Sequence, residues 1–237
     1  MESFKYQHKY KTIKYKYLQQ NYTLNMDKNN YVWYSCYGSN LNEERFLCYI
    51  QGGKPKNSSR EEIGCKDKTL PLENRKYQLN RPLYFAKNSP HWNNGGSGFI
   101  GLYPDKENYT LSRMYLITKE QFVDLVNQEN STTDIKIDFE KAIENRITKV
   151  AETKYGNLLF IEFVDDMPVF SFSTLENIGD SNFVKPDIMY LKTILLGLKE
   201  IYTLSNEEFT EYLLNKPGIK NNYTKDELMN NLFNFIS

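Results

Sequence analysis

Two separate segments of the chain carry groups that could act together on a small molecule. The first is the turn Gly38-Ser39-Asn40, which lies between an aromatic run (31–37) and a predicted helix. A helix N-terminus presents unpaired N–H groups and the positive end of a dipole, so this turn could hold a carboxylate, a phosphate or an oxyanion. The second segment is a later helix that ends in Glu129. We expect this carboxylate to face the turn across a gap that one amino-acid-sized molecule could fill.

The turn is predicted from local residue types. Gly38 permits backbone angles that other residues avoid, and Asn40 with Glu43 has the spacing of a capping box. The helix is therefore expected to begin at Leu41. On these residues alone, an ordinary strand-to-helix turn that binds nothing is an equally good interpretation, because Gly-Ser-Asn is common in turns.

Glu129 ends the apolar face of a predicted helix, 119–129. Phe122, Leu125 and Val126 share that face at helical spacing, and Glu129 lies on it two turns after Phe122. Burial raises the pKa of a carboxyl group, which suits a general acid and base near neutral pH. A helix that frays before Glu129 and leaves its carboxylate in water is the alternative that the pattern leaves open.

These segments resemble two motifs of the γ-glutamylcyclotransferase-like family. The YGSN(L/M) signature of that family, in which the loop after the first strand holds the substrate, is matched by Tyr37, Gly38, Ser39, Asn40 and Leu41. The tract 125–130 is similar to the family's L-x-x-Q-E-G segment, in which the Glu is the acid and base. Asn130 stands where the family has Gly, and Asn is the next best residue for a left-handed helix end.

Two further segments resemble the family more loosely. Trp92, Gly95 and Gly96 are similar to its W-x-G-G tract, although two asparagines lengthen the loop here. A P-x-x-x-Y segment would place Tyr190 near the pocket, whereas the residue type alone favours a core tyrosine on a helix. The resemblance extends over about residues 31–204.

The resemblance implies a cofactor-independent enzyme of the lyase or acyltransferase type. The α-amine of a γ-glutamyl group attacks its own γ-carbonyl and expels an amine or amino acid, leaving 5-oxoproline. Glu129 would carry the proton. The residues that the resemblance assigns to a small-molecule γ-glutamyl substrate are Tyr37, Gly38, Ser39, Asn40, Leu41, Trp92, Gly95, Gly96 and Tyr190.

Other functions remain open on the sequence. The same fold could serve as a non-catalytic module that binds a small anion. An amide hydrolase or deacylase is the weaker alternative, because the chain offers only His8 and His91, shows no metal-ligand spacing and lacks a G-x-S-x-G motif. We therefore expect no metal.

Composition bounds the partners and the compartment. Lys plus Arg and Asp plus Glu number 30 each, which gives no indication of a nucleic-acid partner. The chain has three cysteines, an odd number, and no apolar leader or membrane-length run, so we expect a cytoplasmic protein without a membrane partner. Nothing in the sequence indicates an oligomeric state.

The order of the predicted elements gives the fold class. Residues 1–28, basic and rich in tyrosine, are expected to form a flexible extension, and residues 29–237 a γ-glutamylcyclotransferase-like domain with a helical C-terminal part. Strands come first and helices follow, which indicates an α+β fold with a mixed, barrel-like β-sheet and flanking helices.

Overall fold

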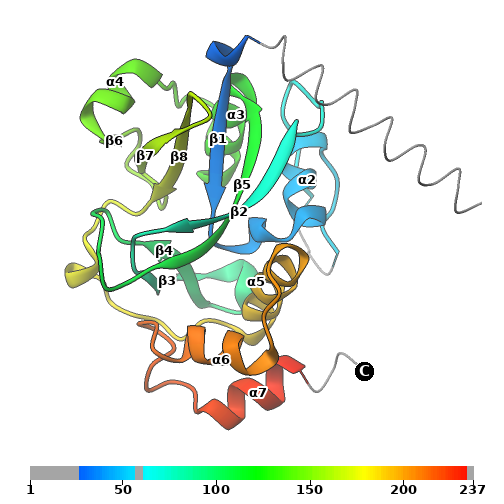
Figure 1. Ribbon diagram of the computed structural model, residues 1–237, viewed down its shortest axis with the longest axis vertical. Helices are drawn as coiled ribbons and strands as arrows, with labels where there is room; N and C mark the ends of the chain where they lie inside the picture. The colour runs from blue at the N-terminus through cyan, green and yellow to red at the C-terminus, as the bar shows by residue number, and fades with distance from the viewer. Residues whose placement is uncertain (1–26, 57–60, 234–237) are drawn as a thin grey trace, which may run out of the picture.

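The first strand, β1 (Tyr31–Cys36), lies in the middle of a six-stranded sheet of order β2-β5-β1-β8-β7-β6 (Figure 1). This computed structural model describes residues 27–56 and 61–233. The predicted extension lies outside the described residues except for its last two, and Lys28 begins the short 3₁₀-helix η1 (Lys28–Asn30). The remaining strands of the sheet are β2 (Glu73–Leu79), β5 (Thr110–Thr118), β6 (Ile147–Lys149), β7 (Asn157–Val164) and β8 (Met167–Ser173).

The sheet is mixed, as predicted. β1 pairs with β8 in parallel, whereas its pairing with β5 and all the other pairings in the sheet are antiparallel. β2 and β6 form two open edges, so the described strands close no barrel. The predicted α+β class is confirmed. A separate antiparallel hairpin consists of β3 (Leu83–Ser89) and β4 (Gly95–Ile100), and Ser173 Oγ at the end of β8 donates to Ile100 O at 2.6 Å.

Helices flank the sheet and the hairpin. α3 (Lys119–Glu129) packs against β1 and β5, and α5 (Ile188–Ile201) packs against β5 and the 3₁₀-helix η2 (Ser39–Leu41). Figure 1 shows α6 and α7 at one end of the molecule, beyond the hairpin, and α5 beside the hairpin. The other helices are α2 (Glu43–Gln51), α4 (Phe139–Asn145), α6 (Asn206–Leu214), α7 (Lys225–Phe233) and the short η3 (Pro90–Trp92) and η4 (Ile178–Asp180).

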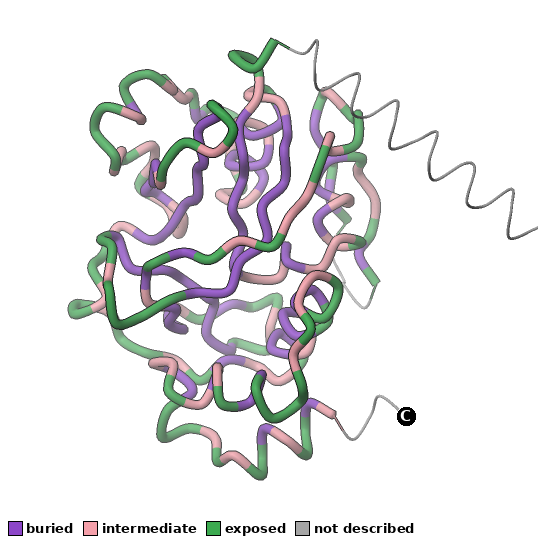
Figure 2. Tube along the Cα trace, in the orientation of Figure 1, coloured by how far each residue is buried: buried purple, intermediate pink, exposed green. Residues whose placement is uncertain are grey.

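The three central strands form the most deeply buried part of the chain, which is purple in Figure 2. Residues 32–36 of β1, 110–117 of β5 and all of β8 are buried. Aromatic side chains fill the space between β1 and α3: the ring of the fully buried Phe122 lies 5.9 Å from that of Tyr34 and 5.8 Å from that of Phe170. Burying a ring of this size stabilises the fold by roughly 1.5–3 kcal/mol, and here it fixes the helix that carries Glu129.

Candidate active site

The carboxylate of Glu129 and the turn after β1 meet directly. Asn40 Nδ2 donates to Glu129 Oε1 at 2.8 Å and lies 3.2 Å from the hydroxyl oxygen of Tyr34. An ionised carboxylate only accepts hydrogen bonds, so the amide nitrogen of Asn40 must be the group that faces it. This orientation leaves Asn40 Oδ1 buried, and it accepts no hydrogen bond from the described residues.

α3 delivers Glu129 as its local sequence predicts. The helix spans Lys119–Glu129, and Thr118 and Gln121 form the reciprocal capping box at its N-terminus. The apolar face packs into the core, and Glu129, the last helical residue, lies where that face meets the turn. Glu129 is therefore half-buried rather than fully exposed to water.

The turn differs in detail from its prediction. The helix begins at Glu43 with Asn42 as its N-cap, so the predicted start at Leu41 and the predicted Asn40–Glu43 capping box are wrong. Asn40 instead lies in η2, where its side chain is free to reach Glu129. Gly38 has φ −109°, so left-handed backbone does not explain the glycine. A Cβ atom at Gly38 would lie 2.8 Å from the hydroxyl oxygen of Tyr190, so a larger residue would have to displace that hydroxyl group.

Two side chains of β5 hold the carbonyl groups of the turn. Tyr115 Oη donates to Asn40 O at 3.1 Å, and Arg113 Nη1 donates to Leu41 O at 3.1 Å. No acceptor among the described residues takes the N–H groups of Gly38, Ser39 or Asn40. Backbone donors without a partner beside a carboxylate can hold a carboxylate or an oxyanion of a ligand.

The electrostatic surroundings of Glu129 favour a proton-carrying role. Burial raises the pKa of its carboxyl group, whereas the hydrogen bond from Asn40 and the positive charges of Arg45 and Lys154 lower it without cancelling the effect of burial. A carboxyl group with a raised pKa can both take and return a proton near neutral pH. Burial also raises the pKa of Tyr190, to about 12, so its hydroxyl group stays neutral.

A cavity of about 30 Å³ is lined by Glu129, by the turn after β1 and by Tyr190. It has room for one or two water molecules, so the open gap is smaller than the amino-acid-sized one expected from the sequence. A γ-glutamyl group could enter only if some of the surrounding aromatic side chains moved. The lining residues are Tyr34, Tyr37, Gly38, Ser39, Asn40, Gly98, Glu129, Tyr155, Phe172 and Tyr190.

Tyr190 and Tyr37 fix two sides of this cavity. Gly98 N donates to the hydroxyl oxygen of Tyr190 at 3.1 Å, and Tyr37 Oη donates to Phe172 O at 2.7 Å. Tyr190 projects from α5, so the first strand, the hairpin and the C-terminal helical part all contribute to one site.

Four of the predicted substrate-binding residues lie outside the cavity lining. Leu41 is fully buried in the core, and Trp92 packs on Tyr190 with ring centroids 4.9 Å apart. Gly95 and Gly96 serve close packing, since a Cβ atom would lie 2.4 Å from Asp187 N or 2.3 Å from Val184 O, respectively. Contact of these four residues with a substrate stays a prediction.

Four residues that the sequence did not indicate also line the cavity: Tyr34, Gly98, Tyr155 and Phe172. The one sequence signal for Tyr155 is Asn130, which stands where the resembled family has glycine. In the structure, Asn130 accepts from Tyr155 N at 3.0 Å and donates to Tyr155 O at 3.3 Å. Asn130 has φ −96° and Ser131 has the positive φ, 52°, so the prediction of a left-handed Asn130 is wrong. The asparagine ties the segment before β7 to the end of α3.

Neither a metal cluster nor a membrane helix is found in the described part of the chain. No group of three or more His, Cys, Asp or Glu side chains there could hold a metal ion. No helix within residues 27–56 and 61–233 is long and apolar enough to cross a membrane.

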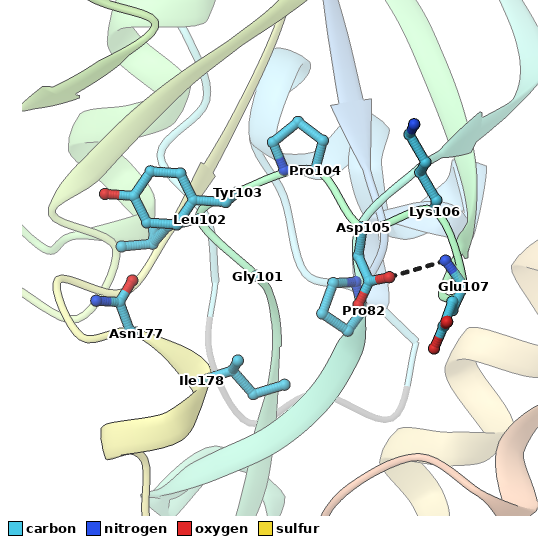
Figure 3. A pocket seen from close by; sticks show the side chains of 10 residues that line it. All are labelled: Pro82, Gly101, Leu102, Tyr103, Pro104, Asp105, Lys106, Glu107, Asn177 and Ile178. Atoms are coloured by element: carbon cyan, nitrogen blue, oxygen red, sulfur yellow. Dashed lines mark hydrogen bonds between the residues drawn. The ribbon is translucent and has the colours of Figure 1, made fainter.

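A larger hollow, of about 460 Å³, lies elsewhere, beside the turn that follows β4 (Figure 3). None of the predicted site residues lines it. The carboxylate of Asp105 accepts hydrogen bonds from Glu107 N, Asn108 N and Asn108 Nδ2, all within its own turn. These three bonds shape the turn and give the hollow no group that is set aside for a ligand. The smaller cavity, which contains the carboxylate of Glu129, is therefore the better candidate for an active site.

Comparison with solved structures yields γ-glutamyl cyclotransferases at low similarity. A structure titled γ-glutamyl cyclotransferase is 16% identical with a TM-score of 0.44, and an uncharacterised human protein is 17% identical with a TM-score of 0.43; each comparison covers 84% of this chain and 98% of the other. A glutathione-specific cyclotransferase from yeast is 11% identical with a TM-score of 0.36, over 78% of this chain and 94% of the other. All three TM-scores lie below 0.5.

Among curated proteins, the chain is similar to histone deacetylase 5 of Arabidopsis thaliana, with 29% identity over 201 residues. The match covers 77% of this chain and 30% of that protein, so the chain spans less than a third of the relative. No model of a known protein family matches the chain.

Proposed function

We propose that this protein releases 5-oxoproline from a γ-glutamyl amide by intramolecular aminolysis, with Glu129 as the single acid and base. The observation that carries the proposal is the half-buried carboxylate of Glu129 facing a turn whose N–H groups, and whose buried Asn40 Oδ1, have no partner among the described residues. Buried polar atoms are nearly always satisfied, so those left over beside a carboxylate indicate a place for a ligand.

Each group has a role in this reaction. Glu129 takes a proton from the substrate's α-ammonium group, and the resulting amine attacks the γ-carbonyl carbon. The N–H groups of Gly38, Ser39 and Asn40 stabilise the oxyanion that forms on the carbonyl oxygen. Glu129 then returns a proton to the leaving nitrogen as its bond to carbon breaks, and the attacking nitrogen gives its second proton to the released amine, which departs as an ammonium ion. Because the reacting atoms belong to one molecule, proximity supplies much of the rate, and the reaction needs no metal or organic cofactor.

Asn40 links recognition to chemistry. Its Nδ2 orients the carboxylate of Glu129, and its orphaned Oδ1 can accept from the substrate's amine. Tyr37 and Tyr190 would shape the site around the γ-glutamyl group, together with the backbone of Gly38 and Ser39.

The cavity volume of about 30 Å³ favours a second candidate, a non-catalytic module that binds a small anion. In such a module the aromatic lining would stay closed around a ligand smaller than a γ-glutamyl amide, and Glu129 would serve only to hold Asn40. The two candidates differ in whether a product forms.

The test is to incubate the protein with a panel of γ-glutamyl amino acids, γ-glutamyl amines and glutathione and to measure 5-oxoproline. We expect product from at least one compound with the wild-type protein and almost none with Glu129→Gln. Equal product from both proteins would remove Glu129 from the mechanism. If neither protein forms product and the variant is folded, the enzymatic proposal fails and the binding module takes its place.

A further inference from the structure

Lys154 places a positive charge beside the cavity of Glu129. It lies in the connection between β6 and β7, and the next residue, Tyr155, lines the cavity. Lys154 Nζ donates to Ser97 Oγ on β4, and Ser97 is followed by Gly98, which also lines the cavity. The ammonium group therefore lies between two segments that form the wall.

The segment that carries Lys154 is held in place. Asn130, next to Glu129, bonds both the N–H and the carbonyl group of Tyr155. Val150 N donates to Gly156 O at 2.8 Å across the base of the loop. The loop is thus fixed at both ends, and it holds Lys154 next to the lining residue Tyr155, just outside the cavity lining.

This ammonium group is poorly compensated. It can donate three hydrogen bonds, yet Ser97 Oγ is its one hydrogen-bond acceptor among the described residues, and no carboxylate there pairs with it. Its other neighbours are the rings of Tyr155 and Phe99, with centroids 5.6 and 6.0 Å from Nζ. Burial lowers the pKa of Lys154, whereas the negative charge of Glu129 acts in the opposite direction. Lys154 is half-buried, and a cation that has lost part of its water is stabilised when an anion lies beside it.

We propose, given the function proposed above, that Lys154 binds the α-carboxylate of the substrate's γ-glutamyl group. This assignment divides the site into three parts. Glu129 and Asn40 Oδ1 receive the α-amine, the N–H groups of the turn receive the oxyanion, and Lys154 receives the carboxylate. Because the protein binds both charged groups of the γ-glutamyl part, the leaving group of the substrate needs no charge in order to be recognised.

The first test measures binding without turnover, by titration calorimetry with 5-oxoproline and with its neutral carboxamide. Wild-type protein should bind 5-oxoproline about 10- to 100-fold more tightly than the carboxamide, as expected for a charge-assisted hydrogen bond. Lys154→Met should lose this preference, and Lys154→Arg should keep part of it. The control is Lys149→Met, whose exposed side chain pairs with Glu152 in the described structure and should keep the preference in full.

Unfolding midpoints of the variants show whether each is folded. A folded Lys154→Met protein that keeps the wild-type preference would overturn the proposal, as would wild-type protein that binds both compounds equally or neither.

A turnover assay separates this proposal from the proposed function. With a γ-glutamyl amine, which has no carboxylate in its leaving group, Lys154→Met should raise KM with little change in kcat. Turnover with an unchanged KM would refute the role of Lys154 and leave the enzyme intact. Carboxylate-dependent binding that needs Lys154, without turnover, would refute the enzyme and leave the binding site.

Discussion

Arg113 is a buried charged side chain and Glu129 a half-buried one, and the groups around them differ sharply. Arg113, with 3% of its side chain exposed, donates to Glu43 Oε2 at 2.9 Å and to Leu41 O, Asn74 Oδ1 and Glu200. Glu129 accepts one hydrogen bond from the described residues, that of Asn40, and lies near an amide oxygen that has no partner.

This difference indicates what each region is for. The Arg113 cluster joins β5 to α2, α5 and β2 and fixes the carbonyl side of the turn, so it is complete without a ligand. The cavity of Glu129 keeps donors and acceptors that have no partner among the described residues and that a ligand could satisfy. A fully bonded network stabilises a structure, whereas a partly bonded one is retained at a cost and indicates function.

The largest expected effect concerns the incomplete region. Glu129→Gln should lower the rate of 5-oxoproline formation by about 10²- to 10⁴-fold, the usual contribution of general acid and base catalysis. The glutamine keeps an acceptor for Asn40 and so preserves the site. Glu120→Gln, on the exposed side of the same helix, is the matched control and should leave the rate unchanged. A similar loss in both variants would contradict a specific role for Glu129.

The complete region should respond in stability. Arg113→Met should destabilise the fold by about 3 kcal/mol, because two carboxylates and a backbone carbonyl lose their partner. For a chain of this size that corresponds to a Tm lower by about 6–12 °C.

The comparison variant for this effect is Arg75→Met. Arg75 has 36% of its side chain exposed and pairs with Glu73 and Asp165 at the surface. Its loss should cost at most about 1 kcal/mol. Thermal unfolding of the two variants at one pH measures the contrast, and equal shifts would refute the view that the Arg113 cluster is the stabilising one.

Asn40 should affect proton transfer more than folding. Its hydrogen bond favours the ionised form of Glu129, so Asn40→Ala should raise the pKa of Glu129 and move the acidic limb of the profile of kcat/KM against pH upward by about one pH unit. Asn42→Ala, two residues later, removes the N-cap of α2 and should cost about 1 kcal/mol of stability without moving that limb. If the limb moved only in the Asn42 variant, the link between Asn40 and Glu129 would fail.

The smallest expected effect is on how the stability of the fold changes with pH. Burial raises the folded-state pKa of Glu129 above its ordinary value of 4.5, so the unfolded chain loses this proton first as the pH rises. Wild-type protein and Glu129→Gln should therefore be equally stable below about pH 4. The variant should become the more stable one as the pH rises through the folded-state pKa, and the difference should then level off. Chemical unfolding across that range measures it, and a wild type that is more stable than the variant at pH 8 would contradict the burial argument.

The parts of this picture that the sequence predicts are those encoded locally. The bounds of α3 and the position of Glu129 follow from helical periodicity within one segment. The predicted start of α2 is wrong because Asn40 and Asn42 both have a side chain that can cap a helix. Only tertiary contacts direct Asn40 to Glu129 instead. Arg113, Lys154 and Tyr155 reach the site through strand register and a distant loop, which no local pattern reveals.

The most direct measurement of the central claim is the pKa of the Glu129 carboxyl group, followed by carbon-13 NMR of glutamate-labelled protein with Glu129→Gln used to assign the signal. We expect a pKa above 4.5 in the free protein and a clear change in that titration when 5-oxoproline is added. A titration at the ordinary value that does not respond to 5-oxoproline would show a solvated carboxylate with no ligand beside it, and would contradict the proposed site.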